Sequence, residues 1–447
     1  MSETIILETG CGQIMGLDCG DCNAFLGIPF ATAQRFEYCT PIDKWQNRLD
    51  ATRYGSVVTQ YRTYNGHLDI PERLFYYNEF RKDIDFTYAE DSLNLNIFAP
   101  KDKSDCPVII FIHGGGFNSG SCYDTAIVGD EYARRGIVFV SIQYRVGPLG
   151  YFTHEAIREK YGRDGNFGLD DQVTAIRWVK NHIADFGGNP NNITIMGQSA
   201  GAISIQLMCI SDKCRGLFQH AIMMSGAGAF PSFAQPRSTD RTHEYWLDVM
   251  NTAGCKSFEE FQSLDIEKLF AAWEEVRSRR KDNMYNTMPV IDDCYLTDTV
   301  SNLIKKPLPV DYMVGYTNND MYAPILAHIG NKFTKDNHAF LYYFDIDAPG
   351  DNNKAFHSAD IRYMFGTLKA SHRPYDAQDE KVSDMMMRYV VNFATSGNPN
   401  LSSDKTLPEW KNDGKALHIT KDLNDWKQMR PNLITLTRNW IKIGDPK

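Results

Sequence analysis

The sequence contains no block of basic residues and no apolar run long enough to cross a lipid bilayer. Its formal net charge of −9 is spread along 447 residues, which makes nucleic acids and anionic membrane surfaces poor candidates for partners. The first residues, Met1–Thr4, do not resemble a charged-then-apolar leader. We therefore expect a soluble, cytoplasmic protein with no membrane span and no nucleic-acid partner.

Cysteine is also scarce, with ten residues in the whole chain. Cys19 and Cys22 form a C-x-x-C pair, a spacing that zinc sites and redox pairs use. A zinc site needs two further ligands, and the sequence has no second C-x-x-C and no H-x-x-x-H. Metal or redox chemistry at this pair is the alternative. We interpret the cysteines as buried thiols in a reducing compartment, and we expect neither a metal nor a cofactor.

Repeats, linkers rich in glycine and serine, and low-complexity tracts are absent as well. The composition that is present is ordinary for a globular protein, with 43% hydrophobic and 23% charged residues. The length suffices for one large α/β domain or for two or three smaller ones. Because nothing divides the chain, we predict a single domain over residues 1–447.

The strand-like segments are mostly continuous apolar runs. Cys106–Ile112 and Ile137–Arg145 are rich in β-branched and aromatic residues, and both are apolar on both faces. Such runs are typical of a parallel sheet that is covered by helices on both sides. Similar strand-like segments lie at 192–196, 220–225, 311–317 and 339–344.

The remaining segments predict helices and additions to this sheet. Apolar residues recur at helical spacing over 169–186, and the charged stretch 242–280 is helical, which predicts a helical cap within 230–310. The N-terminal residues 5–50 predict small antiparallel strands.

Two further segments lie before the first parallel strand. The alternation of apolar and polar residues over 90–98 predicts a half-buried strand. Residues 54–89 are aromatic and have no clear period, which predicts an irregular excursion over the surface. We expect this excursion to help wall the site, although core packing explains the same aromatic residues.

The most informative stretch is the G-x-S-x-G motif at 197–201, which lies between a predicted buried strand and a segment that can continue as a helix. In that context the motif predicts a nucleophile elbow, a sharp turn that exposes the Ser199 hydroxyl near a helix N-terminus. Side chains at Gly197 or Gly201 would collide with the neighbouring strand and helix. The alternative is chance, because short motifs of this kind recur in many chains.

A serine hydroxyl needs a base, an acid that orients the base, and donors for the oxyanion. The glycines of His113-Gly114-Gly115-Gly116, after a predicted strand, let bare backbone N–H groups approach a substrate oxygen. We predict Gly115, Gly116 and Ala200 as the donors. A phosphate cradle is the alternative, but no G-x-x-x-x-G-K-[ST] motif is present.

The base and the acid are expected downstream of Ser199, beyond the carboxyl ends of strands. His357 lies in a loop-like stretch after the strand that ends near Phe344, and Asp320 follows the strand through Thr317. Position alone leaves other residues open for both roles. They are His328, His338, His372 and His418 for the base and Asp292, Asp293 and Asp311 for the acid.

Several longer motifs together resemble the type-B carboxylesterase family, whose members include para-nitrobenzyl-esterase-like enzymes, carboxylesterases and cholinesterases. The resemblance spans nearly the whole chain. The motifs that carry it are His113–Phe117, Gly147–Phe152, Gly165–Gln172 and Phe186–Gly201, with support from Gly27–Phe30, Glu90–Asn96 and Asn392–Asn400.

This resemblance implies an α/β-hydrolase fold, which is an α/β architecture with a mostly parallel central sheet. It also implies Asp320 as the triad acid, in a stretch where the family usually has Glu, and His357 as the base. Gln198 stands where the family usually has Glu, so a cationic choline ester is less favoured. Ser92 replaces a cysteine that many relatives pair in a disulfide, and the short chain means that the substrate pockets are not carried over.

The expected function is that of a serine carboxylesterase with a Ser199–His357–Asp320 triad and an oxyanion hole at Gly115, Gly116 and Ala200. The partner is a small-molecule ester, apolar or aromatic and of small to medium size. The alternatives are a non-catalytic binding or adhesion module on the same fold, and hydrolysis of amides, lactones or thioesters. The sequence leaves the oligomeric state open between a monomer and a weak dimer.

Overall fold

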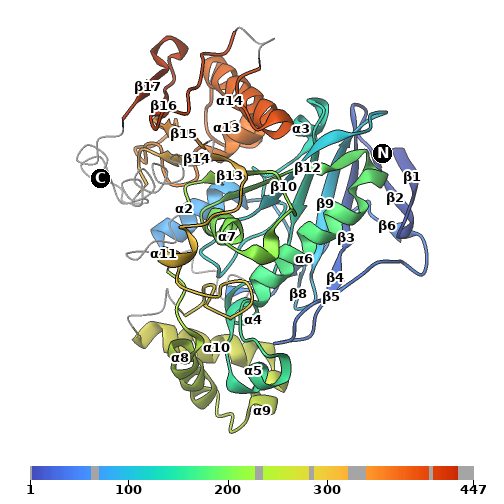
Figure 1. The fold of residues 1–447 in the computed structure, drawn as a ribbon, viewed down its shortest axis with the longest axis vertical. Helices are drawn as coiled ribbons and strands as arrows, with labels where there is room; N and C mark the ends of the chain where they lie inside the picture. Colours follow the sequence, from blue (N-terminus) through green and yellow to red (C-terminus); the bar gives the residue numbers. More distant parts are fainter. Residues whose placement is uncertain are drawn as a thin grey trace.

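The computed structural model describes residues 3–61, 70–226, 235–280, 286–320, 339–401 and 406–430. Within these residues, thirteen strands form one central sheet (Figure 1). A short strand, β6 (Leu49–Asp50), pairs with β2. The others follow in the order β1 (Glu3–Thr9), β2 (Gly12–Asp18), β3 (Cys22–Pro29), β9 (Asn94–Pro100), β11 (Val138–Ile142), β10 (Cys106–Ile112), β12 (Gly188–Gln198), β13 (His220–Met224), β14 (Asp311–Thr317), β15 (Ala339–Phe344), β16 (Ala416–Ile419) and β17 (Lys427–Met429).

The middle of the sheet is parallel. Every neighbouring pair from β11 to β16 runs parallel, while β9 and β17 add antiparallel strands at either side. Ile112 pairs with Gly197 and Gln198 pairs with Met224. The carboxyl ends of β10 and β12, which precede His113 and Ser199, therefore lie side by side.

Alternate residues of the parallel strands face two separate cores. In β10, Ile110 belongs to one core and Ile109 to the other. The first core holds α6 (Phe167–His182) and α7 (Ala200–Cys209), and the second holds α3 (Asp130–Arg134), α13 (Ile361–Phe365) and α14 (Ala377–Ser396). Helices therefore cover both faces, and the predicted α/β-hydrolase architecture is confirmed.

The N-terminal strands β1, β2 and β3 pair antiparallel, as predicted, and join the sheet through β9. The prediction of a half-buried strand over 90–98 is wrong, because all residues of β9 are buried. The side-chain amide groups of its two asparagines find acceptors inside the protein. The Asn96 amide donates to Ser141 Oγ at 3.1 Å, and the Asn94 amide donates to the Ser56 carbonyl at 2.7 Å.

The prediction of an irregular excursion over 54–89 is wrong in its middle, where α2 (Pro71–Phe80) forms. Short strands β7 (Val57–Val58) and β8 (Tyr88–Ala89) pair on either side of it in the chain. The spacing of apolar residues does not show the helical period of α2, because the inward face of this helix includes a charged residue. Glu79 is buried there in an ion pair with Arg373 at 2.7 Å.

Helices α8 (Thr239–Thr252), α9 (Phe258–Ser263) and α10 (Ile266–Arg279) fill the stretch predicted to be helical over 242–280. Side chains at their boundaries explain two of the starts, since Ser257 accepts from the Glu260 N–H and Asp265 accepts from the Glu267 N–H. In Figure 1 these helices lie with α5 (Glu155–Tyr161) at the end of the molecule opposite α13 and α14.

All ten cysteines lie in the described ranges, and each is a free thiol. The expectation of buried thiols is wrong for Cys19, which is exposed at the β2–β3 turn, while Cys39 and Cys294 are partly buried. The other cysteines are buried. Among the described helices, none combines the length and apolarity that a membrane crossing requires.

Candidate active site

Ser199 occupies the single residue between strand β12 and helix α7. Its backbone angles are φ 54° and ψ −120°, a conformation that residues with a side chain rarely adopt. The Ser199 N–H donates to the Met224 carbonyl of the next strand at 2.9 Å, which fixes the turn to the sheet. The predicted strand–turn–helix context of the G-x-S-x-G motif is thus present.

The two glycines of the motif allow the close approach of strand and helix. A Cβ atom on Gly201 would lie 2.1 Å from the Ile112 carbonyl oxygen, and one on Gly197 would lie 2.8 Å from the Gly201 carbonyl carbon. Both distances are far below van der Waals contact. The elbow therefore excludes any larger residue at either position.

The glycine loop after β10 lies directly against the elbow. A Cβ atom on Gly114 would be 3.1 Å from Ser199 Cβ, so the loop and the serine are in contact. Gly115 and Gly116 have φ values of +116° and +63°. Among the described residues, no acceptor bonds to the backbone N–H of Gly115, Gly116 or Ala200. All three N–H groups are therefore available to a ligand oxygen.

Asp320 and His357 come together from two neighbouring loops, after β14 and after β15. Asp320 Oδ2 lies 2.9 Å from His357 Nδ1, and the Asp320 side chain has no exposed surface. The loops are joined one residue earlier in each, where Asn319 and Phe356 form a β-bridge and the Asn319 N–H donates to the Ala355 carbonyl at 2.9 Å. Backbone pairing thus holds the shorter aspartate arm within reach of the imidazole.

Several carboxylates act on the His357 imidazole. Burial acts to lower the pKa of His357, but the charge and hydrogen bond of Asp320 outweigh it, with smaller contributions from Asp360 and Glu72, so that the pKa is raised. Burial also raises the pKa of the Asp360 carboxyl to about 6, against the hydrogen bond from Tyr342. Two buried carboxyl groups therefore stabilise the imidazolium form.

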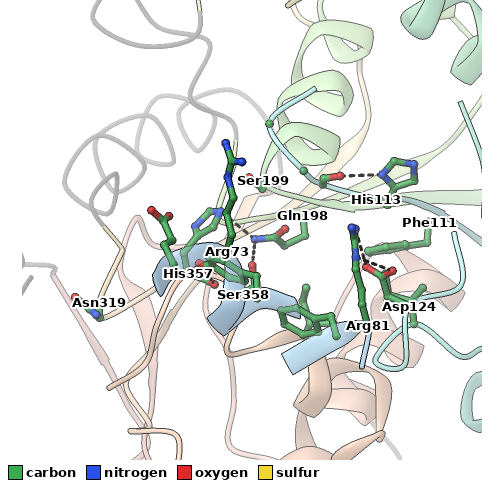
Figure 2. A pocket seen from close by; sticks show the side chains of 18 of the residues that line it. Arg73, Arg81, Phe111, His113, Asp124, Gln198, Ser199, Asn319, His357 and Ser358 are labelled. Atoms are coloured by element: carbon green, nitrogen blue, oxygen red, sulfur yellow. Dashed lines mark hydrogen bonds and ion pairs between the residues drawn. The ribbon is translucent and has the colours of Figure 1, made fainter. Parts of the chain in front are cut away.

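Gln198 makes the contact at the other ring nitrogen of His357. Its Nε2 lies 3.2 Å from His357 Nε2 and donates to Ser358 Oγ at 2.7 Å (Figure 2). Ser199 and His357 are both described, and no hydrogen bond joins them. No sequence pattern indicates this contact, because it depends on how the His357 loop folds back over the elbow.

The competing candidates have other surroundings. His328 and His338 lie outside the described residues. Asp311 pairs with His220 at 2.9 Å, and Asp292 accepts backbone N–H groups of its own loop. The others are likewise apart from Ser199, namely His372 near Glu79, His418 beside Asp345 and Asp293 in the loop that follows Asp292.

Ser199 and His357 open into one cavity of about 720 Å³, with the glycine loop on its wall. Helix α2 also supplies part of the cavity wall, including Tyr76 and Phe80. The Tyr76 hydroxyl donates to the His357 carbonyl at 3.1 Å, so α2 also fixes the loop that carries the imidazole. The expectation that the aromatic region 54–89 walls the site is confirmed for this helix.

The described residues include no group of three or more His, Cys, Asp or Glu side chains arranged to hold a metal ion. In the C-x-x-C pair, burial raises the pKa of Cys22 to about 11 and also raises that of Cys19. These thiols are therefore protonated at neutral pH and make poor ligands and nucleophiles without further activation.

The sequence is similar to that of known esterases and lipases. It is 26% identical to a para-nitrobenzyl esterase of Bacillus subtilis (strain 168), over 88% of this chain and 90% of that protein. It is 28% identical to a bile salt-activated lipase of Rattus norvegicus, over 89% of this chain and 78% of that protein. A cholinesterase of Mus musculus is 31% identical over 76% of this chain and 57% of its own length.

Solved structures agree on the fold. A PNB esterase superposes with a TM-score of 0.81 at 22% identity, covering 98% of this chain and 99% of that one. A thermophilic PNB esterase gives a TM-score of 0.80 over 97% of this chain and 99% of that one. The profile of the carboxylesterase family matches residues 3–338 and 320–435. With an α/β-hydrolase fold and a family match over most of its length, the chain belongs to the carboxylesterase family.

Proposed function

We propose that this protein is a serine carboxylesterase in which Ser199 is the nucleophile, His357 the base and Asp320 the orienting acid. The observation that carries the proposal is the 2.9 Å contact between the buried Asp320 Oδ2 and Nδ1 of His357, which lines the same cavity as Ser199. Hydrolysis of carboxylic esters is the activity of the family. The acyl-enzyme route is the family's general mechanism.

In the first half of the reaction, Ser199 Oγ attacks the ester carbonyl and His357 Nε2 takes its proton. The N–H groups of Gly115, Gly116 and Ala200 bind the oxyanion. Each such donor contributes about 2.7–4 kcal/mol to transition-state stabilisation. The imidazolium then gives its proton to the departing alkoxide, which leaves an acyl-Ser199 ester.

In the second half, water replaces the alcohol. His357 takes a proton from the water, hydroxide attacks the acyl carbonyl, and the same oxyanion donors bind the second tetrahedral intermediate. Return of the proton to Ser199 Oγ releases the acid. Asp320 keeps the imidazole in the tautomer that has Nδ1–H and stabilises the positive charge in both halves.

The contact of His357 with Gln198 belongs to the resting state in this proposal. The two Nε2 atoms lie 3.2 Å apart, so the imidazole is directed toward Gln198. A small rotation of the Ser199 or the His357 side chain must therefore precede proton transfer from Ser199 to His357. Hydrogen bonds between catalytic groups are commonly long in free enzymes and tighten when substrate binds.

We further propose a single domain over residues 1–447, with α8, α9 and α10 as a helical cap within 230–310. The cavity walls include Phe80, Phe111 and Ile127, which favours an apolar or aromatic group next to the scissile ester. A monomeric or weakly dimeric cytoplasmic protein acting on small esters fits this proposal.

The test compares wild type with Ser199→Ala on a chain-length series of para-nitrophenyl esters. We expect wild-type turnover and a loss of roughly 10⁶-fold in kcat for the variant. Ser204→Ala is the matched control, because it removes from the following helix α7 a buried hydroxyl that bonds to no described residue. A Ser199→Ala variant with near-native turnover would refute the assignment. A wild type that neither hydrolyses any ester nor reacts with a serine-directed phosphonate would favour a binding module instead.

A further inference from the structure

One ion pair lines the cavity away from the proposed triad. Arg81 follows the last residue of α2, Asp124 lies in the loop after the glycine motif, and they are 8% and 9% exposed. Figure 2 shows the pair next to Phe111, on the opposite side of Gln198 from His357. The lining of the cavity also includes the apolar residues Ile127 and Ile361. A charged pair thus lies beside an aromatic side chain in the wall of the cavity.

The pair uses only one edge of the guanidinium. Arg81 Nε lies 3.3 Å from Asp124 Oδ1, and Arg81 Nη2 donates to Asp124 Oδ2 at 3.4 Å. A guanidinium has five N–H donors in a rigid fork, and this arrangement engages the Nε–Nη2 edge. Among the described residues, no acceptor bonds to Nη1. The donors of Nη1 are therefore available to a molecule in the cavity.

The backbone around Arg81 is fixed from both sides. The Arg81 N–H donates to the Tyr77 carbonyl at 2.9 Å. The neighbouring Phe80 carbonyl accepts from the Thr125 N–H at 3.0 Å and from Thr125 Oγ1 at 3.2 Å. The segments that carry Arg81 and Asp124 are thus hydrogen-bonded to one another, and the free edge has a defined direction before any ligand binds.

An arginine within α2 provides a contrast. Arg73 also lines the cavity, but its Nη1 donates to the Tyr61 hydroxyl at 2.8 Å and its guanidinium lies over the Tyr61 ring at 4.5 Å from the centroid. Tyr61 in turn donates to Glu274 of α10 at 2.9 Å. Arg73 therefore links α2 to α10, whereas Arg81 offers a free edge to the cavity.

We propose that Arg81 is a specificity-determining residue, whose Nη1 edge binds a neutral hydrogen-bond acceptor, such as a carbonyl oxygen, on the non-reacting part of the ester. The inference rests on the proposed esterase function and names its substrate class. An all-alkyl chain at this place would bury the Nη1 donors without a partner. A carboxylate would bring a second negative charge to a guanidinium that Asp124 already neutralises.

The test compares three para-nitrophenyl esters with acyl chains of equal length. They are the hexanoate, the 5-oxohexanoate with a ketone near the chain end, and the glutarate monoester with a terminal carboxylate. Because either the acyl or the alcohol part of the ester can face Arg81, pentyl acetate and 4-oxopentyl acetate form a second set. The quantity measured is the ratio of kcat/KM for the ketone ester to that for its alkyl analogue.

We expect this ratio to fall roughly ten- to hundredfold in Arg81→Met, in one of the two sets, since a hydrogen bond to a charged donor contributes that much discrimination. In wild type, the glutarate monoester is expected to be poorer than the ketone ester. Arg134→Met is the matched control, because it removes an ion-paired arginine of α3 that does not line the cavity. Its ratio should equal that of wild type.

The double variant Arg81→Met/Asp124→Asn covers the case in which the loss of Arg81 beside a charged Asp124 prevents folding, and the same fall is expected there. Equal ratios in wild type and in the folded variants, in both sets, would overturn the inference. A wild-type preference for the glutarate monoester would also overturn it, in favour of an anionic substrate. Failure of the proposed function itself is separate, because it would show as turnover of the hexanoate by Ser199→Ala.

Discussion

Replacing Asp320 by asparagine tests the part of the site that the sequence alone left open. The substitution keeps the size of the side chain and removes its charge, which lies 2.9 Å from His357 Nδ1. At that distance, two unit charges attract by about 6 kcal/mol with an effective dielectric constant of about 20. The imidazolium forms only as the reaction proceeds, so this attraction is lost mainly from the transition state.

We therefore expect kcat of Asp320→Asn to fall on the order of 10⁴-fold, since each 1.36 kcal/mol or so corresponds to a factor of about ten. A similar loss accompanies the same change in a serine protease triad, where the imidazole adopts the wrong tautomer. The introduced amide can donate to His357 Nδ1, which would leave Nε2 protonated and unable to accept the Ser199 proton.

Asp320→Glu is the matched control, because it restores the residue that the family usually has and keeps the charge. The Asp320 side chain is fully buried, so the added methylene costs about 1–3 kcal/mol in packing. We expect a loss of roughly ten- to hundredfold. The assay is kcat and KM with a short para-nitrophenyl ester, with thermal unfolding measured in parallel. An Asp320→Asn enzyme within tenfold of wild type would refute the reasoning.

Four further predictions concern the elbow and the titration of His357. Because the pKa of His357 is raised and its neutral form is the proposed base, kcat/KM should fall as the pH decreases through that pKa. Gln198→Glu places a negative charge at the 3.2 Å contact and should move the acidic limb of the pH–rate profile to higher pH. Asp360→Asn removes a carboxylate near His357 and should move the acidic limb to lower pH. Profiles of kcat/KM against pH measure both shifts, and an acidic limb that does not move contradicts the assigned electrostatics. Gly201→Ala drives a Cβ to 2.1 Å from the Ile112 carbonyl and should cost more than tenfold in kcat together with about 1–3 kcal/mol of stability, which denaturant unfolding measures; native values would show that the elbow tolerates a side chain.

Most of the parallel strands were predictable because each is a short apolar run with a clear end, whereas the parallel strand β16 was not predicted. Strand β14 (Asp311–Thr317) and strand β15 (Ala339–Phe344) have the predicted bounds. The full burial of strand β9 and the helix α2 were not predictable, since both depend on buried polar groups. Asn96 and Glu79 are stable inside only because Ser141 and Arg373 meet them from distant parts of the chain.

The candidate site shows the same division. The elbow at Ser199 is a local feature, because strand, glycines and helix are adjacent in the sequence and their steric requirements can be worked out from the motif. The proximity of Asp320 and His357 depends on a backbone bridge between two loops, at Asn319 and Phe356. The sequence pattern alone left several aspartates open as the acid and several histidines open as the base. Only the resemblance to a known family distinguished Asp320 and His357 from the other candidates.

The ion pair in the wall of the cavity lay beyond sequence reasoning. Arg81 and Asp124 are 43 positions apart and belong to segments without a motif. Their ion pair exists because α2 lies across the cavity and its end is hydrogen-bonded to the loop at Thr125. Substrate preference is therefore the property for which the three-dimensional arrangement adds most.

The most direct test of the central claim is to map the covalent adduct of a serine-reactive phosphonate by peptide mass spectrometry, with residual ester hydrolysis measured on the same samples. We expect one adduct per chain, on Ser199, with activity lost in proportion to labelling, and no adduct in Ser199→Ala. An adduct on a different residue, or full activity with Ser199 completely labelled, would contradict the assignment of Ser199 as the nucleophile.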